Sequence, residues 1–552
     1  MAFSYLDKTK LSEMAKAAKD AMQPFFDSFD EYERIAQNKP KSNIPQGLPK
    51  VTDGTIAAYV SSTPKAIIQQ IPTGEVEALD EDKDLAGIAE LVLTENILPN
   101  ANSTGTVIQK SWAALSKAIV YGSQPAYVFF KQDGDYTGAD FKLPNIRDVW
   151  HEPGKVYDKD CNYKFLRSWF QPSDIKAIIA RHSKLEKTPW DIEKLKGLEE
   201  KEKDYKQDER ASHNKGIEII FGFQKGAGAK IYGFTLDDGE ILYEETNPDP
   251  TGAIPIVSLY ADVDLISPLG RSPISPVIGH QNMLDTEMQM YQFAQALGLA
   301  PPVIKRGAYS SAILQMKPNA IWDLGVGETN SATLLNVNTG AQNNFANNYS
   351  LIKTQIMNHT NLQDSSASAT AGNIGYSKTH AGVEQQQQRI NINNNQLLKN
   401  FESWFGDICK IMLNIHFALN HGKEDIKLTE QYIKRRQIQD PDFEAESATV
   451  SYDEVIKGFD FKISASTSKV KDDGESIEKL EKLLQLAVQY PDLQNIYNIQ
   501  KVGARIISKL GVEDPEELII NPDKDGNGIP DIEEQSEENQ EVEDGYLSEF
   551  NQ

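Results

Sequence analysis

The residues best suited to chemistry lie near the end of the chain, where side-chain oxygens follow the spacing of a calcium-binding loop. These oxygens fall at loop positions one, three, five, nine and twelve, on Asp523, Asp525, Asn527, Asp531 and Glu534. Calcium takes about six to eight oxygen ligands, and a glutamate at the last position can supply two of them. Gly528 stands where such a loop turns sharply, whereas Pro530 is unusual for an EF-hand. The alternative is a plain polar turn in an acidic tail.

No other stretch has the spacing of a familiar catalytic, nucleotide or metal motif. The chain contains no G-x-x-x-x-G-K-[ST] phosphate loop, no H-E-x-x-H zinc pair and no G-x-S-x-G nucleophile turn. Gly226 and Gly228 belong to a predicted hairpin turn, and His416 and His421 have poor spacing for two ligands on one helix face. A Ser-His-Asp group assembled by the fold stays open. We therefore predict a protein that is not an enzyme and requires no cofactor.

The composition indicates a large acidic protein with several domains. Its 552 residues carry a formal net charge of −25, with a pI near 4.8 and a mean hydropathy of −0.49. The sequence has no apolar run of about eighteen residues, so we expect a soluble chain without membrane partners. The two cysteines, Cys161 and Cys409, exclude a disulfide framework and a cysteine-rich zinc site. The acidic balance argues against a sequence-specific DNA-binding regulator, which normally presents basic patches.

The elements that would organise the chain run from residue 268 to about residue 420. A P-L-G-R-S-P turn at residues 268–273 precedes a predicted helix, which ends before Pro301 and Pro302 because proline stops a helix. Short β-like runs separated by turns follow. A second predicted helix carries one apolar face, formed by Phe345, Tyr349, Ile352 and Ile356. A stretch rich in Ser, Ala, Thr and Gly comes next, and then a long helix from about Val383 to Asn420.

This order, opened by the P-L-G-R-S-P turn, resembles the portal protein, or head-to-tail connector, of tailed bacteriophages. In that family two helices form a stem, the β module between them forms a clip, the polar stretch is a tunnel loop and the long helix spans the wing. The resemblance implies an α+β, mainly helical fold, and it covers roughly residues 250–515. The alternatives are a helical enzyme or binding module of unknown substrate, or another component of the head–tail connector.

On this resemblance the chain divides into successive segments. The wing spans residues 1–265, the first stem helix 266–300, the β clip 301–342, the second stem helix 343–361 and the tunnel loop 362–382. The long wing helix and a returning wing segment span 383–465, a helical crown 466–520, and an acidic tail with the candidate calcium loop 521–552.

The resemblance also implies the work of the protein and its partners. About twelve copies would form a homo-oligomeric ring at one capsid vertex of the virion, assembled in the host bacterial cytoplasm. Double-stranded DNA would pass through this channel without sequence specificity during packaging and ejection. The ring would contact the major capsid or scaffold protein, dock the terminase and then receive a head–tail adaptor.

Particular residues follow from this comparison. Trp322 would anchor the clip interface. The tunnel loop would face the DNA through small and polar side chains, namely Ser366, Thr370, Asn373, Lys378 and His380. Lys378 and His380 would be the contacts to phosphate, since the loop has no other Lys, Arg or His.

The regions outside this central stretch are predicted to mix helices and strands. Residues 1–36, 82–98 and 106–121 have helical periodicity, whereas Thr55–Val60 and Ala66–Ile71 look like strands. Residues 216–259 alternate with period two, so the run around Phe221 should pair with the run around Gly233. Two more amphipathic helices are predicted over residues 475–490 and 493–510.

If the loop from Asp523 to Glu534 binds calcium, replacing Asp523 and Asp525 together with alanine should abolish the binding of one Ca²⁺ per chain. The reason is that two carboxylate ligands would be lost from a site that needs about six oxygens. Calorimetric titration of both proteins with Ca²⁺ measures the effect. A wild-type chain that takes up no Ca²⁺ would contradict the site.

Overall fold

The computed structural model describes much of the chain up to residue 466. The described residues are 5–42, 44, 48–68, 72–78, 89–133, 136–185, 187–198, 203–205, 214–264, 267–301, 303–306, 320–323, 331–334, 341–360, 380–419, 423–427, 447–451 and 461–466. They fall within one unit, Met1–Thr467. The second unit, Ser468–Gln552, lies outside the described residues, and so do the predicted crown helices and the candidate calcium loop.

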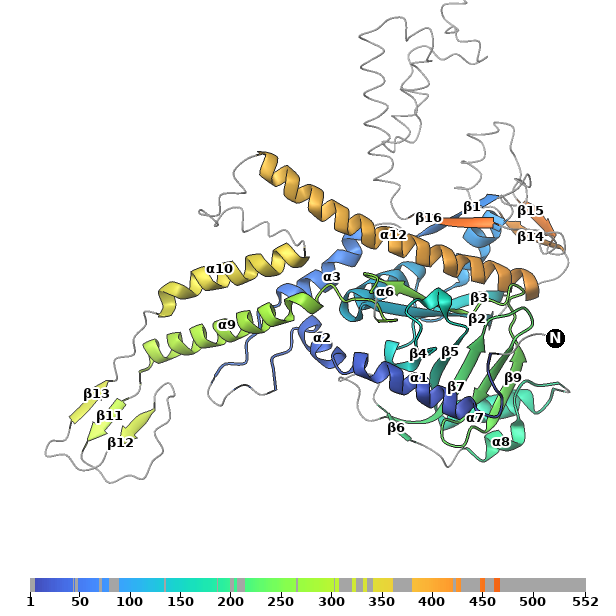
Figure 1. Ribbon diagram of the computed structural model, residues 1–552, viewed down its shortest axis with the longest axis horizontal. Helices are drawn as coiled ribbons and strands as arrows, with labels where there is room; N and C mark the ends of the chain where they lie inside the picture. The colour runs from blue at the N-terminus through green and yellow to red at the C-terminus, as the bar shows by residue number, and fades with distance from the viewer. Residues whose placement is uncertain are drawn as a thin grey trace, which may run out of the picture. The chain divides into compact units, whose positions relative to one another are not determined.

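Helices outweigh strands in the described residues, and the expected α+β class is confirmed (Figure 1). None of the helices that the structure describes is long and apolar enough to cross a membrane.

Three helices begin the chain. α1 (Leu11–Phe26) and α2 (Phe29–Ala36) confirm the predicted N-terminal helical region. The strands expected over Thr55–Val60 and Ala66–Ile71 are wrong, because α3 (Thr55–Ile67) covers the first and the start of the second. The buried side chains of α3 recur every three or four residues, and the burial of this face outweighs local strand preference: Ile56, Tyr59, Val60, Thr63, Pro64 and Ile67.

A six-stranded antiparallel sheet has the order β4-β5-β7-β8-β9, with β6 added to β7. Its strands are β4 (Val149–His151), β5 (Tyr163–Phe170), β6 (Lys203–Tyr205), β7 (Asn214–Gln224), β8 (Lys230–Phe234) and β9 (Ile241–Thr246). Phe221 lies opposite Gly233, so the predicted pairing is confirmed. Ile220 faces a core shared with α1, whereas Ile219 faces a core shared with α7 (Pro172–His182) and α8 (Ile192–Lys196). Helices therefore cover both faces of the sheet.

A three-stranded antiparallel sheet, ordered β10-β2-β3, lies beside it. It contains β2 (Ser123–Asp133), β3 (Tyr136–Lys142) and β10 (Ile256–Tyr260). α6 (Val107–Tyr121) packs against β2 and β10, and the long helix α12 (His380–Leu419) packs against all three strands. The predicted apolar stripe of α12 is buried here, with Phe401, Phe405, Ile408 and Met412 in the largest core.

Shorter elements join these layers. A π-helical turn, η1 (Val92–Ile97), runs into α5 (Leu98–Asn100), and brief 3₁₀ turns occur at η2 (Ile146–Asp148), η3 (Asp158–Asp160) and η4 (Ser275–Val277). Two antiparallel strand pairs are β1 (Thr73–Ala78) with β16 (Phe461–Ser466), and β14 (Lys423–Lys427) with β15 (Ser447–Ser451). The first pair joins the strand that follows α3 to the last described residues of the unit.

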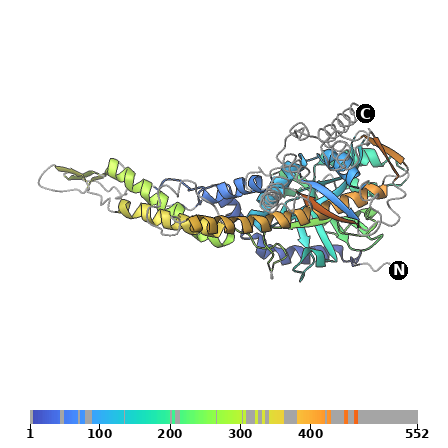
Figure 2. The same cartoon turned by 90° about the horizontal axis from the view of Figure 1, so that it is seen from above.

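Between the sheets and α12 the chain forms two helices separated by a small sheet. α9 (Ile278–Leu299) and α10 (Ala341–Thr360) lie side by side in both ribbon views (Figure 1 and Figure 2). The strands between them are β11 (Val303–Arg306), β12 (Ile321–Asp323) and β13 (Ser331–Leu334). The predicted order of helix, β module, helix and long helix is therefore present in the described residues.

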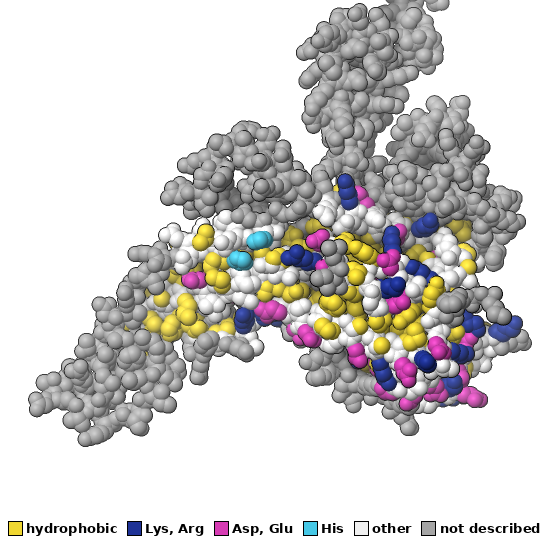
Figure 3. Space-filling model, viewed as in Figure 1, with side chains coloured by type: hydrophobic (Ala, Val, Ile, Leu, Met, Phe, Trp, Pro, Cys, Tyr) yellow, Lys and Arg dark blue, Asp and Glu magenta, His cyan; other side chains and the backbone are white. Residues whose placement is uncertain are grey.

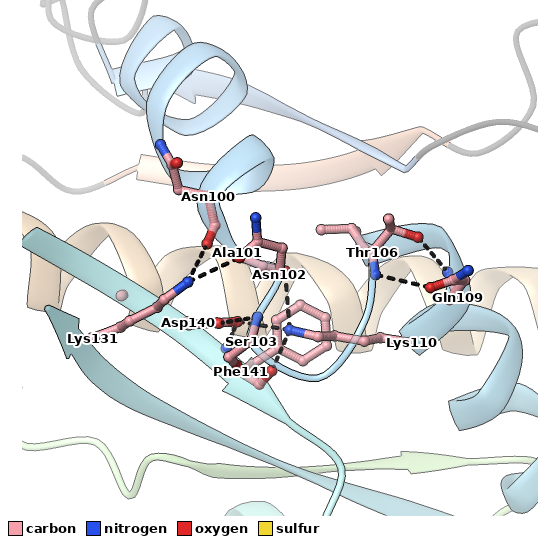
Figure 4. A network of polar contacts seen from close by, with 12 residues as sticks. Asn100, Ala101, Asn102, Ser103, Thr106, Gln109, Lys110, Lys131, Asp140 and Phe141 are labelled. Carbon is pink, nitrogen blue, oxygen red and sulfur yellow. Dashed lines mark hydrogen bonds and ion pairs between the residues drawn. The ribbon is translucent and has the colours of Figure 1, made fainter. Parts of the chain in front are cut away.

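A buried ion pair fixes α6 to the three-stranded sheet (Figure 4). Lys110 Nζ lies 2.7 Å from Asp140 Oδ1 and also donates to the carbonyl oxygens of Phe141 and Ala101. The backbone N–H groups of Ser103 and Phe141 donate to the same carboxylate. Burial lowers the pKa of Lys110, and its hydrogen bond to Asp140 opposes that effect. Every strong donor and acceptor of the pair is thus satisfied away from water.

Lys110→Met should destabilise the fold by about 3–5 kcal/mol, because it leaves the Asp140 carboxylate buried without its cation. The double substitution Lys110→Met with Asp140→Asn should cost less than Lys110→Met alone, since no charge then remains buried. Chemical denaturation of wild type and the two variants measures the free energy of unfolding. The control is Lys131→Met, at a half-buried lysine, which should change this free energy little. A double variant less stable than Lys110→Met would contradict the assignment.

Candidate functional site: the paired helices and their small sheet

α9 and α10 pack as an antiparallel pair. Tyr291 of α9 stacks on Phe345 of α10, with ring centroids 4.1 Å apart. At the start of α9 and the end of α10, the ring centroids of His280 and His359 lie 6.0 Å apart. Residue numbers therefore rise along α9 in the direction in which they fall along α10, so the two helices run antiparallel. Ile352 and Ile356 of α10 are buried, which confirms the apolar face predicted for this helix.

The small sheet has the order β12-β11-β13, with β11 parallel to β12 and antiparallel to β13. It begins four residues after α9 ends, with Pro301 in the connection. Among the strands that the structure describes, β12 and β13 stand at the two edges of this sheet. Edge strands present N–H and C=O groups that can pair with another chain. Trp322, the predicted anchor, is the central residue of β12 and lies opposite Ile304.

The turn before α9 is locked onto the end of α6. Ser272 Oγ donates to the carbonyl oxygen of Ile119 at 2.8 Å, and Arg271 N donates to Asp262 O. Gly270 has φ +68°, and a Cβ there would lie 2.6 Å from Asp262 O. Only glycine fits such a left-handed, crowded position. The P-L-G-R-S-P turn thus sets the point from which α9 leaves the sheets.

A polar network holds the first turns of α9 to α2. Arg34 Nη2 donates to Asn282 Oδ1 at 2.7 Å, and Asn282 Nδ2 donates to Glu31 Oε1 at 3.0 Å. Arg34 also contacts Glu31 through two nitrogens. The hydrogen bond from Arg34 lowers the pKa of Glu31, so this carboxylate stays charged near neutral pH. The amide of Asn282 therefore completes a charged clamp between the two helices.

Asp53 joins three helices at the base of the pair. Its backbone N–H donates to Asp285 Oδ1 of α9 at 3.0 Å, and its carboxylate accepts from the Tyr349 hydroxyl of α10. The same carboxylate accepts from the backbone N–H of Thr55, where α3 begins. Gln289 Nε2 of α9 donates to the carbonyl oxygen of Val51 nearby. We call Asp53, Asp285 and Tyr349 the base joint.

Burial raises the pKa of Asp285, although the hydrogen bonds from Asp53 and Gln281 oppose the rise. A carboxyl whose pKa is raised on folding weakens the fold once pH exceeds the unfolded value, because the unfolded chain ionises more readily. The base joint therefore holds the helices at the cost of a buried carboxylate, which points to geometry rather than stability as its role.

The outer surface of the pair is poor in charge and carries exposed apolar side chains. Of the 42 residues in α9 and α10, the Asp, Glu, Lys and Arg residues are Asp285, Glu287 and Lys353. Met283 and Met290 of α9 are 57% and 53% exposed, and Leu351 of α10 is 57% exposed. Figure 3 shows hydrophobic side chains gathered over this part of the molecule. Met283 and Met290 are two turns apart and share one helix face.

A buried Ser-His-Asp group occurs elsewhere, between the two larger sheets. Asp158 Oδ1 lies 3.0 Å from His151 Nε2 and 2.6 Å from Lys164 Nζ, and Ser258 Oγ donates to it at 3.1 Å. Although burial raises the pKa of Asp158, Lys164 and His151 hold it well below its usual range. The carboxylate is central, so the histidine does not bridge serine and aspartate as it would in a nucleophilic triad. This group fixes β10 against β5.

The other sequence-predicted site residues lie in different places. His380 is the first residue of α12, so the helix begins within the predicted tunnel loop. Ser366, Thr370, Asn373 and Lys378 lie outside the described residues. So do the candidate calcium ligands Asp523, Asp525, Asn527, Asp531 and Glu534. Within the described part of the chain, no three His, Cys, Asp or Glu side chains form a metal-binding group.

Sequence reasoning missed the base joint. Asp53 lies more than two hundred residues from Asp285 and Tyr349 in the chain, and each is an ordinary polar residue. The one available signal was Asp285 itself, a carboxylate one residue after the apolar Leu284 on the predicted helix. His416, which the sequence analysis considered as a metal ligand, is a separate case. Burial lowers the pKa of His416 to about 4, so this side chain stays neutral near neutral pH.

Asp285→Asn should make the chain more stable than wild type at pH 7, because it keeps the oxygen acceptor and removes a buried charge. The gain should shrink as pH falls toward the unfolded carboxyl pKa of about 3.9, where the wild-type carboxyl is also protonated. Denaturation at several pH values measures this, with the exposed Asp20→Asn as matched control. A variant equally destabilised at pH 7 and pH 4 would contradict the account.

The chain matches no protein-family model and none of the curated proteins. Its function must therefore be inferred from its own residues and elements. The paired helices, their small sheet and the base joint are the features on which that inference rests.

Proposed function

We propose that this chain is the subunit of a phage portal ring, a structural channel for genome packaging and ejection. The observation that carries the proposal is the order and pairing of α9, β11–β13, α10 and α12. This order is the one that the resemblance implies for a stem, clip, stem and wing helix. In this reading α9 and α10 form the stem, and the small sheet forms the clip. The role is structural rather than enzymatic.

The surface of the stem supports assembly with identical copies. Each chain carries −25 formal charges, so copies repel one another unless they meet through surfaces that hold little charge. α9 and α10 provide such a surface, with twelve Asn and Gln residues among their 42 and with exposed Met283, Met290 and Leu351. Burying those apolar side chains between copies would favour a closed ring of about twelve subunits, as the family implies.

The clip supports a second kind of contact. Its edge strands β12 and β13 can accept a strand from a neighbouring subunit, the terminase or a head–tail adaptor. Trp322 is the aromatic residue on the first of these edges, and aromatic residues are enriched at the energetic centres of interfaces. In the proposal the clip is the docking face and Trp322 its anchor.

The channel would tolerate DNA without binding a particular sequence. The stem presents few cations, and tight DNA binding depends on Lys and Arg contacts with phosphate. Residues 362–382 are proposed as the tunnel loop, with Lys378 and His380 as the contacts to phosphate. The ring would stand at one capsid vertex of a virion, alongside the capsid or scaffold protein.

Replacing Met283 and Met290 together with aspartate should abolish ring formation while leaving the thermal unfolding of the isolated chain unchanged, because both side chains are exposed and lie on the proposed contact face. Negative-stain images and native mass measurement give the assembly state. The matched control is Leu185→Asp, which adds a charge at a residue that is 51% exposed outside the stem and should leave rings intact.

Two outcomes would count against the proposal. A wild-type chain that stays monomeric at every protein and salt concentration would contradict the ring. Rings that form equally well in the Met283 and Met290 variant would show that the stem surface is not the contact between subunits.

A further inference from the structure

We infer that His280 and His359 form a transition-metal site that ties the start of α9 to the end of α10. Their ring centroids lie 6.0 Å apart, and their planes are inclined by 36°. His280 is the third residue of α9, and His359 is the last but one of α10. Figure 3 shows imidazoles gathered at one place over this helical pair. An ion held by both rings would cross-link two helices, and the inference does not depend on the proposed ring.

The spacing of the rings suits two imidazole nitrogens on one ion. Zinc–imidazole bonds of about 2.0–2.1 Å place two ring centroids about 5 Å apart at a tetrahedral angle and about 6 Å apart at a wider angle. The observed 6.0 Å lies at the wide end of this range. His359 is exposed, so its ring can turn by the small amount that a narrower angle requires.

A second observation comes from the buried side of His280. Its Nδ1 is buried and has no hydrogen-bond partner among the described residues. A buried polar nitrogen without a partner costs free energy, and ligation of that nitrogen removes the cost. Buried apolar side chains lie about one helical turn from each ring, Leu284 from His280 on α9 and Ile356 from His359 on α10. An apolar layer on one side of the rings lowers the local dielectric there, which strengthens interactions with a cation.

The donor set decides which ions fit. Neutral imidazole suits Zn²⁺, Ni²⁺ and Cu²⁺, whereas Ca²⁺ and Mg²⁺ prefer oxygen ligands. Because the two rings have no third His, Cys, Asp or Glu ligand among the described residues, water would complete the coordination. The negative end of the α10 dipole favours a cation here, but the positive end of α9 opposes it, so the two imidazoles must supply most of the affinity.

The test is calorimetric titration of the full-length protein with Zn²⁺ in the presence of excess Ca²⁺, which occupies oxygen-rich sites such as the candidate loop near Asp523. The variants are His280→Gln and His359→Gln. The matched control is His182→Gln on α7, where the ring contacts the Thr188 hydroxyl. Wild type and control should bind one Zn²⁺ per chain with equal affinity. Each test variant should bind at least about tenfold more weakly, because a direct ligand is lost.

A thermal scan provides a second readout, since an ion that binds only the folded chain raises its melting temperature. Zn²⁺ should raise the melting temperature of wild type and control, and raise that of either test variant less. Zn²⁺ binding that is absent from wild type, or that survives unchanged in either test variant, would overturn the inference. These outcomes are the same for a monomer and for a ring, so they are separate from the test of the portal proposal.

Discussion

The arrangement of this protein depends on the base joint, the partly buried contact in which Asp53 meets Asp285 and Tyr349. The pair of helices α9 and α10 has little core of its own, so the direction of the pair must be set where it leaves the sheets. The joint does so with directional hydrogen bonds, which link α9 and α10 to the start of α3. The Arg34–Asn282 clamp and the Gly270 turn restrain the same end of α9. Directional contacts of this kind specify geometry more than they add stability.

Because the base joint fixes their direction, α9 and α10 can carry an exposed apolar surface that would otherwise be unfavourable. Exposed Met283, Met290 and Leu351 are tolerated if a partner covers them, and a fixed direction allows every copy to present them alike. Copies of this strongly acidic chain would repel one another least where α9 and α10 meet, because these two helices hold few charges. In the proposed ring, packing, charge and direction would therefore favour the same contact, between identical subunits through α9 and α10.

Sequence periodicity predicted the elements with long, regular apolar stripes. α12 follows its stripe through Phe401 and Phe405, and the hairpin register around Phe221 follows strict alternation. α3 was missed because its short run of β-branched and aromatic residues fits either period, and only the surrounding core decides between them. The base joint was not predictable, since nothing local in Asp53 indicates a partner more than two hundred residues away. Buried polar contacts of this kind arise from tertiary packing.

In the proposed function α9 and α10 would surround a channel at the centre of a ring of identical chains. Distances between spin labels at equivalent positions test it most directly, with cysteines introduced at the exposed Thr286 of α9 and Asp20 of α1 while the buried Cys161 and Cys409 stay unlabelled. The account predicts several intermolecular distances in the ratios of chords of a regular polygon, shorter for Thr286 than for Asp20. An absence of intermolecular distances, or a closer approach of the Asp20 labels, would contradict it.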